Sequence, residues 1–158
     1  MHEVAEIAAM PRRGVLRIKQ WNADSTLIPE RPSLEDLNVW ALGPGDWLLV
    51  ARTEAAFASA HSALSPSAGF AVVDVSDAFC TYRVAGSEAG TLLSKGCGLD
   101  FDVTRFAVGC NARTRFAQIA LIVCRVESDA FELHVGRSYA HYLHAWLLDA
   151  RPDVTGDE

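Results

Sequence analysis

Apolar and polar residues alternate early in the chain with the period of two that β-strands require. In residues 15–21, Leu16 and Ile18 fall on one face and basic residues on the other, which predicts an edge strand. Residues 46–51 end in a continuous apolar run that is typical of a buried strand. Between them, residues 22–45 hold three prolines and little periodicity, which predicts an extended arm or loop. Docking on a partner and a disordered linker are both compatible with such an arm.

A helix that runs to Leu64 is predicted next, because Thr53 is a plausible N-cap and Glu54 falls in the first turn. Pro66 is expected to stop this helix. Two further strands are predicted at residues 70–75 and 79–85, where β-branched and aromatic side chains predominate.

The next prediction is a short helix that Ser87 caps at its start, with Leu92 and Leu93 turned inward. Lys95 falls in the last turn, where a cation favours the negative end of the helix dipole. Gly96 is expected to end the helix in a left-handed conformation.

The last third of the chain predicts three strands and one helix. The strands are expected at residues 112–117, 119–126 and 130–135, the last with Phe131, Leu133 and Val135 on one face. Ser138 is expected to cap a final helix with one apolar stripe, made of Tyr139, Tyr142, Leu143, Trp146 and Leu147.

This order of elements does not alternate strand and helix, so it predicts an α+β fold with a largely antiparallel sheet and a few helices. We expect residues 1–45 to form an N-terminal strand and arm, residues 46–150 the α+β domain, and residues 151–158 an acidic tail.

Composition narrows the classes of function. Of 158 residues, 14 are basic and 20 acidic, and the net charge of −6 argues against a nucleic-acid partner. The longest apolar run, residues 119–124, is far shorter than the roughly 20 residues of a membrane span. With no secretory signal in the sequence either, we expect no membrane association and a cytoplasmic location.

Motifs for catalysis are weak. The cysteines contain no CxxC pair, and neither a GxSxG, a P-loop nor a GxGxxG pattern is present, so Gly43-Pro44-Gly45 is interpreted as a turn. The three histidines near the C-terminal end, His134, His141 and His144, are the only metal-like group, and solvated side chains explain them more simply. We predict no catalytic residue, no cofactor site and no metal site on this chain.

A basic cluster in residues 94–115 is the densest polar segment. Its cations, Lys95, Arg105, Arg113 and Arg115, suit either an anionic pocket or ion pairs with Asp100 and Asp102. Cys97, between two glycines and near Lys95, is better explained by a tight turn than by reactivity.

These residues carry a resemblance that runs over about residues 46–149. The chain resembles the gamma subunit of heterotetrameric sarcosine oxidase, a family similar in turn to a shortened form of the folate-binding fold of the glycine-cleavage T-protein. The most specific part is Leu92-Leu93-Ser94-Lys95-Gly96-Cys97-Gly98-Leu99-Asp100. Shorter matches are Asp74-Val75-Ser76, Val84-Ala85-Gly86, Phe106, Gly109-Cys110, Phe131-Glu132-Leu133 and Arg137-Ser138-Tyr139-Ala140.

The resemblance implies a non-catalytic subunit in an assembly with alpha, beta and delta subunits, chiefly bound to alpha. FAD, FMN, NAD, zinc and tetrahydrofolate are then expected on the other subunits, which together oxidise sarcosine. Gly98 and residues 101–104 depart from the family pattern, so another N-methyl amine stays open as the substrate.

Two other functions compete with this hypothesis. The first is a free-standing folate-binding module of T-protein type, which would use the basic cluster. The second is a hydrolase or metalloenzyme that would use the histidines. For the subunit hypothesis we expect these interface residues: Lys95, Gly96, Cys97, Asp100, Arg113, Arg137 and Tyr139.

Overall fold

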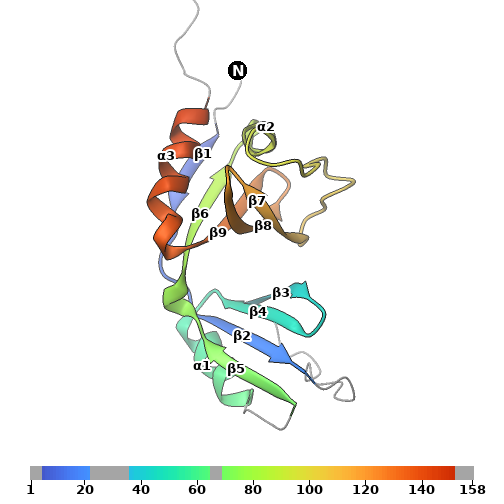
Figure 1. Cartoon of the computed structure of the whole chain (residues 1–158), viewed down its shortest axis with the longest axis vertical. Helices are drawn as coiled ribbons and strands as arrows, with labels where there is room; N and C mark the ends of the chain where they lie inside the picture. The colour runs from blue at the N-terminus through green and yellow to red at the C-terminus, as the bar shows by residue number, and fades with distance from the viewer. Residues whose placement is uncertain (1–4, 22–35, 65–68, 152–158) are drawn as a thin grey trace, which may run out of the picture. The chain divides into compact units, whose positions relative to one another are not determined.

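A computed structural model describes residues 5–21, 36–64 and 69–151, which form two compact units (Figure 1). One unit, here called the terminal unit, contains residues 1–11 and 78–158. The other, the inserted unit, contains residues 12–77. The chain therefore starts in the terminal unit, builds the inserted unit and then returns. The expected domain boundary after residue 45 falls inside the inserted unit.

The terminal unit is built on a five-stranded sheet in which every neighbouring pair is antiparallel. The first described strand pairs with β6, so a segment for which the sequence predicted no strand completes this sheet. In spatial order the strands are β1 (Glu6–Ala9), β6 (Phe79–Ala85), β9 (Ala130–Gly136), β8 (Ile119–Glu127) and β7 (Asn111–Phe116).

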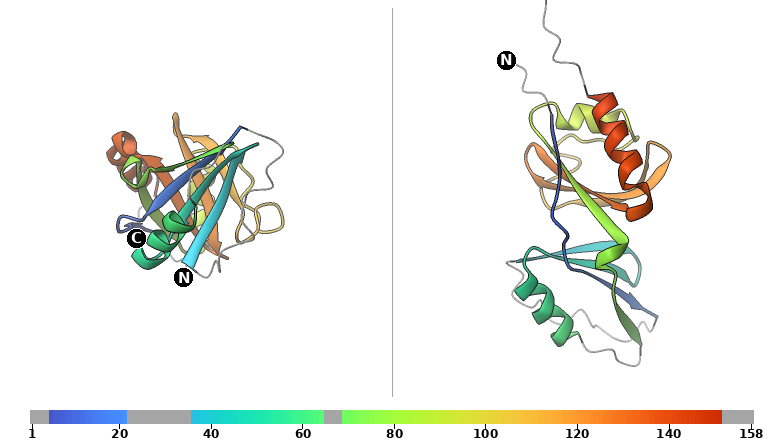
Figure 2. Two further views of the ribbon diagram at one scale, coloured as in Figure 1. Left: turned by 90° about the horizontal axis from the view of Figure 1, so that it is seen from below. Right: turned by 90° about the vertical axis from the view of Figure 1, so that its left-hand side faces the viewer.

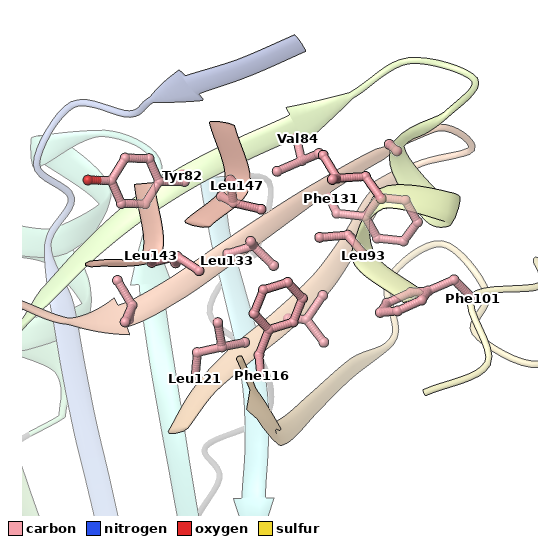
Figure 3. Close-up of a cluster of buried hydrophobic side chains, with 14 of the residues drawn as sticks. Tyr82, Val84, Leu93, Phe101, Phe116, Leu121, Phe131, Leu133, Leu143 and Leu147 are labelled. Atoms are coloured by element: carbon pink, nitrogen blue, oxygen red, sulfur yellow. The ribbon is translucent and has the colours of Figure 1, made fainter. Parts of the chain in front are cut away.

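Two helices and one face of this sheet enclose the core of the terminal unit. Leu92 and Leu93 come from α2 (Ala89–Ser94), and Leu143 and Leu147 from α3 (Ala140–Ala150); all four are at most 1% exposed. Figure 2 shows α3 lying against the strands of its unit, and Figure 3 shows Leu93, Leu143 and Leu147 converging with side chains of the sheet. Each fully buried leucine contributes about 1.5–3 kcal/mol of hydrophobic stabilisation.

The other face of β9 is also buried, which the alternating pattern did not predict. Phe131, Leu133 and Val135 face the core as predicted, but Glu132 and His134 are only 5% and 2% exposed. Thr81 of the neighbouring strand forms a 2.8 Å hydrogen bond with Nδ1 of His134.

The inserted unit is a four-stranded antiparallel sheet with one helix, α1 (Glu54–Ala63), packed on one face. Its strands, in spatial order, are β3 (Leu37–Gly43), β4 (Asp46–Ala51), β2 (Val15–Gln20) and β5 (Phe70–Asp74). Leu16, Ile18, Leu49 and Phe70 are buried in its core.

Two predictions about this unit are wrong. Residues 37–43, expected to be irregular, form β3, because their partner β4 supplies the apolar neighbours that the local pattern lacks. β2 is not an edge strand, since β4 and β5 flank it. Its basic residue Arg17 is accommodated there by a two-pronged ion pair with Asp46, at 2.9 and 2.6 Å. The rest of the expected arm, residues 22–35, lies outside the described residues.

The turn between β3 and β4 confirms the interpretation of Gly43-Pro44-Gly45. Gly45 has a φ of +68°, a left-handed conformation that residues with a Cβ adopt only with strain. Its carbonyl accepts a 2.7 Å hydrogen bond from the backbone N–H of Gln20, which ties the turn to β2.

The predicted N-cap of α1 is confirmed, because the hydroxyl of Thr53 accepts a 3.2 Å hydrogen bond from the backbone N–H of Ala56. We expect Thr53→Ala to lower the free energy of unfolding by about 1 kcal/mol, since this N–H then loses its capping acceptor. Thr53→Ser keeps the acceptor and serves as the control. Equal urea midpoints for the two variants would contradict the capping role.

The capping predictions for the other helices are wrong. α2 begins after Glu88, so Ser87 lies one residue too early to cap it, and Gly96 does not have a positive φ. A 3₁₀ turn, Arg137–Tyr139, precedes α3, which places Ser138 inside the turn and makes Tyr139 the residue before the helix. Tyr139 and Tyr142 are 51% and 44% exposed, so the predicted apolar stripe is buried only in part.

The fold class is confirmed. Antiparallel pairing accounts for all strand contacts of both sheets, and the few helices cover single faces. The structure thus has two antiparallel sheets where the sequence indicated one. Pro66 and residues 152–158, including the expected acidic tail, lie outside the described residues.

Candidate subunit interface

The segment Leu92–Asp100, which carries the most specific part of the resemblance, joins α2 to the core of the terminal unit. Gly96 lies against the fully buried ring of Phe116, and a Cβ built at Gly96 would be 2.6 Å from Cε1 of that ring. The same ring packs edge-on against Trp146 of α3 at a centroid distance of 5.0 Å. Gly96 is therefore required here for close packing.

Three hydrogen bonds connect Gly96 and its neighbours to the β7–β8 turn and to α3. The carbonyl of Gly96 accepts from the backbone N–H of Ala117 at 2.9 Å, and the carbonyl of Ala117 accepts from the hydroxyl of Tyr142 at 2.8 Å. The ammonium group of Lys95 donates to the carbonyl of Ala150 at 2.8 Å, close to the negative end of the α3 dipole. We call these six residues, Lys95, Gly96, Phe116, Ala117, Tyr142 and Trp146, the Gly96 junction.

The turn between β7 and β8 belongs to this junction and is strained. Ala117 and Gln118 have φ angles of 46° and 75°, a left-handed region that favours glycine and asparagine. The bonds of Ala117 to Gly96 and Tyr142 hold the turn, and Oε1 of Gln118 accepts from the guanidinium of Arg115 at 2.7 Å. The surrounding contacts thus offset a strain of about 1–3 kcal/mol per residue.

A buried arginine holds the loop that follows the family string. Arg125 of β8 is 4% exposed, and its guanidinium donates to the carbonyls of Phe101 and Ser128. The same group lies 4.6 Å from the centroid of the Phe131 ring, a cation–π contact. The sequence analysis missed Arg125. The signal available was a single charge within the predicted strand of residues 119–126.

The acidic residues of this loop form local turns rather than ion pairs with the basic cluster. Asp100 accepts from the backbone N–H of Asp102 at 3.0 Å. Asp102 accepts from the hydroxyl and the backbone N–H of Thr104, at 2.5 and 2.8 Å, and these hydrogen bonds lower the pKa of the Asp102 carboxyl.

The basic cluster does not converge on one site. Lys95 is bound to Ala150 and Arg115 to Gln118, while Arg105 and Arg113 are exposed. Within the described residues none of these four cations forms an ion pair with Asp100 or Asp102. The expectation of ion pairs is therefore wrong.

The three histidines also lie in different environments. His134 is buried on β9, 3.4 Å from a carboxylate oxygen of Glu132. His144 stacks on Tyr82 at 5.4 Å, and His141 is exposed. Among residues 5–21, 36–64 and 69–151, no group of three His, Cys, Asp or Glu side chains is placed to hold a metal ion. All four cysteines, which lie within these ranges, are free thiols.

The expected interface residues therefore divide into two groups. Gly96 and Cys97 are half-buried in the terminal unit, where Gly96 lies against Phe116 and Sγ of Cys97 is 3.9 Å from the carbonyl of Leu93. Lys95 is exposed, although its ammonium group is bound to the carbonyl of Ala150. The other exposed candidates are Asp100, Arg113, Arg137 and Tyr139. The valines at 103 and 108, 52% and 54% exposed, were not foreseen as surface residues.

Two solved structures have the same fold as this chain. One is heterotetrameric sarcosine oxidase from Corynebacterium sp. U-96 in complex with pyrrole 2-carboxylate, with a TM-score of 0.80 and 19% identity over 98% of this chain and 87% of that chain. The other is the glycine cleavage system aminomethyltransferase T from Bartonella henselae, with a TM-score of 0.66 and 16% identity over 93% of this chain but only 46% of that one. The chain thus has a shortened T-protein fold.

The family follows from the sequence itself. Residues 31–153 match the model of the sarcosine oxidase gamma subunit family, and the chain belongs to this family. No curated protein matches it. The prediction of a gamma subunit is confirmed, and the free-standing folate-binding module is not favoured. Within the described residues, no helix is long and apolar enough to cross a membrane.

Proposed function

We propose that this chain is a non-catalytic, architectural subunit of a sarcosine-oxidising assembly. The observation that carries the proposal is the family match over residues 31–153. The internal use of the family string supports it, because Lys95 and Gly96 are engaged in packing and hydrogen bonding rather than held at a cavity.

The partners in this proposal are the other subunits of the assembly, chiefly the alpha subunit, with beta and delta completing it. FAD, FMN, NAD, zinc and tetrahydrofolate are assigned to those subunits, and the assembly is placed in the cytoplasm. The net reaction converts sarcosine, oxygen and water into glycine, formaldehyde and hydrogen peroxide. Formaldehyde can also be captured as methylene-tetrahydrofolate.

Exposed apolar and aromatic side chains in the terminal unit are the proposed anchors. Tyr139 is half-exposed beside the exposed Arg137, and tyrosine and arginine are enriched among the residues that dominate binding energy at interfaces. Val103 and Val108 add exposed apolar surface on the loop that Arg125 holds.

Tagged purification from cells that contain the other subunits tests this function. We expect the tagged chain to retain larger subunits, a flavin absorbance spectrum and sarcosine-dependent peroxide formation. Tyr139→Ser is expected to weaken retention about tenfold or more, because a buried aromatic anchor is worth about 2 kcal/mol. His141→Ser, an exposed change two residues away, is the matched control.

A lone, colourless 17 kDa species would contradict the proposal. So would an assembly of the other subunits that oxidises sarcosine equally well without this chain. Binding of tetrahydrofolate by the isolated chain would instead revive the free-standing module.

A further inference from the structure

Strand β7 forms one edge of the five-stranded sheet, and its outward backbone groups belong to alternate residues. β7 and β8 are joined by a two-residue turn with Phe116 opposite Ile119, and the backbone N–H of Arg125 donates to the carbonyl of Cys110. Even-numbered residues of β7 therefore bond to β8, while Arg113 and Arg115 direct their N–H and C=O groups away from the sheet.

The side chains of these two residues form a positively charged strip. Both are exposed, and they lie on the face opposite the core residue Phe116. Their cross-strand neighbours on β8, Ile122 and Ala120, carry no charge. Within the described part of the chain no carboxylate pairs with Arg113 or Arg115, although acidic residues outnumber basic ones in the sequence.

We propose that the β7 edge binds an extended, acidic segment of a partner subunit, which adds a sixth strand to the sheet. This proposal rests on the proposed function, because it takes the partner from the same assembly. β7 has six residues, about 20 Å of strand, which suits a segment of similar length. Backbone hydrogen bonds would give affinity, and carboxylates opposite Arg113 and Arg115 would select the partner.

The same arginines argue against a second copy of this chain as the occupant. Two β7 edges paired antiparallel would bring arginines of both copies together, and like charges directly opposite destabilise a strand pair. Charged side chains also commonly protect sheet edges from unwanted pairing. The same arginines attract an acidic strand. Charge therefore favours binding of an acidic partner over pairing of two copies of this chain.

Hydrogen exchange at single-residue resolution tests the backbone part of the proposal without a substitution. The amides of Arg113 and Arg115 are expected to exchange at least tenfold more slowly in the assembled complex than in the isolated chain. The amides of Ala112 and Thr114, which already bond to β8, are the internal controls. Unchanged exchange of the two arginine amides in an assembled complex would overturn the proposal and leave the proposed function intact.

Charge reversal tests the recognition part. The double variant R113E/R115E is expected to retain the partner subunits at least tenfold less well at low salt than the wild type, with an unchanged melting temperature. R52E, an exposed arginine of the inserted unit, is the matched control. Two results would overturn the proposal. The first is normal assembly of R113E/R115E. The second is an R113S/R115S variant that assembles normally but self-associates when isolated, because the arginines would then serve only to prevent self-pairing. A wild-type chain that retains no subunit would overturn both the proposed function and this inference.

Discussion

Gly96→Ala is expected to lower the free energy of unfolding by about 2–3 kcal/mol, a large effect for a single methyl group. The added Cβ would overlap the Phe116 ring, which is fully buried and packs edge-on against Trp146. Because the ring is buried and packed, either it or the backbone of the Gly96 junction must shift to admit the methyl group. That shift also strains the hydrogen bond from Ala117 to the Gly96 carbonyl.

The control for this prediction is Gly98→Ala, because a Cβ at Gly98 meets no atom within 4 Å. Both variants remove a glycine from the same segment, and neither position has a positive φ. A comparison of their free energies of unfolding in urea should therefore show whether lost packing or lost backbone flexibility causes the destabilisation. Equal losses of stability in the two variants would show that close packing at Gly96 is not the cause.

A second variant checks the partner in this clash. Phe116→Leu opens space next to residue 96, so Gly96→Ala should cost less in its presence than in the wild type. Additive effects of the two changes would contradict the direct contact, because residues in contact normally show a coupling of about 0.5 kcal/mol or more.

The sequence predicted the importance of Gly96 but not its reason. A glycine after a predicted helix usually ends it in a left-handed conformation, and the helix–Lys–Gly pattern fits that rule. Its actual requirement is set by Phe116, which is 20 residues further along the chain. A contact of this kind has no local signal, since it depends on how β7 is placed against α2.

The same limit explains the errors elsewhere. The elements with strong local patterns, such as β6 and the helix after Thr53, were predicted close to their observed bounds. β3 was missed because prolines and glycines surround it and pairing with β4 stabilises it. Four candidates, Asp100, Arg113, Arg137 and Tyr139, were chosen by residue type, and the structure shows that all four are exposed.

Arg125 illustrates a residue whose role the sequence conceals, and its replacement by methionine should be the other most damaging change. Methionine fills similar volume but cannot donate to the carbonyls of Phe101 and Ser128. Each buried acceptor left without a donor costs about 1–3 kcal/mol, and loss of the contact with the Phe131 ring removes about 0.5–1 kcal/mol more.

An opposing effect limits the loss. Burying a guanidinium is costly, and its Nε has no hydrogen-bond acceptor among the described residues, so removing the charge recovers part of the desolvation free energy. The carbonyl of Phe101 is buried where it meets Arg125, however, and methionine offers it no donor, whereas the carbonyl of Ser128 is only partly buried. We therefore expect a net loss of about 2–3 kcal/mol in the free energy of unfolding.

The loop should respond more strongly than the fold as a whole. Phe101 packs edge-on against Phe106 and Phe131, at 5.8 and 5.4 Å, and the guanidinium of Arg125 holds the carbonyl of Phe101. Backbone hydrogen bonds of Arg125 to residues 109 and 110 survive the substitution. Faster amide exchange in Arg125→Met is thus expected at residues 101–106 and less so at 109 and 110.

Arg105→Met is the control for this last prediction, because it removes an exposed arginine from the same loop. It should leave both the urea midpoint and the exchange of residues 101–106 unchanged. Arg125→Lys adds a sharper comparison, since a lysine keeps the charge but cannot reach two carbonyls with a planar fork. If lysine restored full stability, charge alone would explain the effect. A partial rescue is expected if the two directed hydrogen bonds hold the loop.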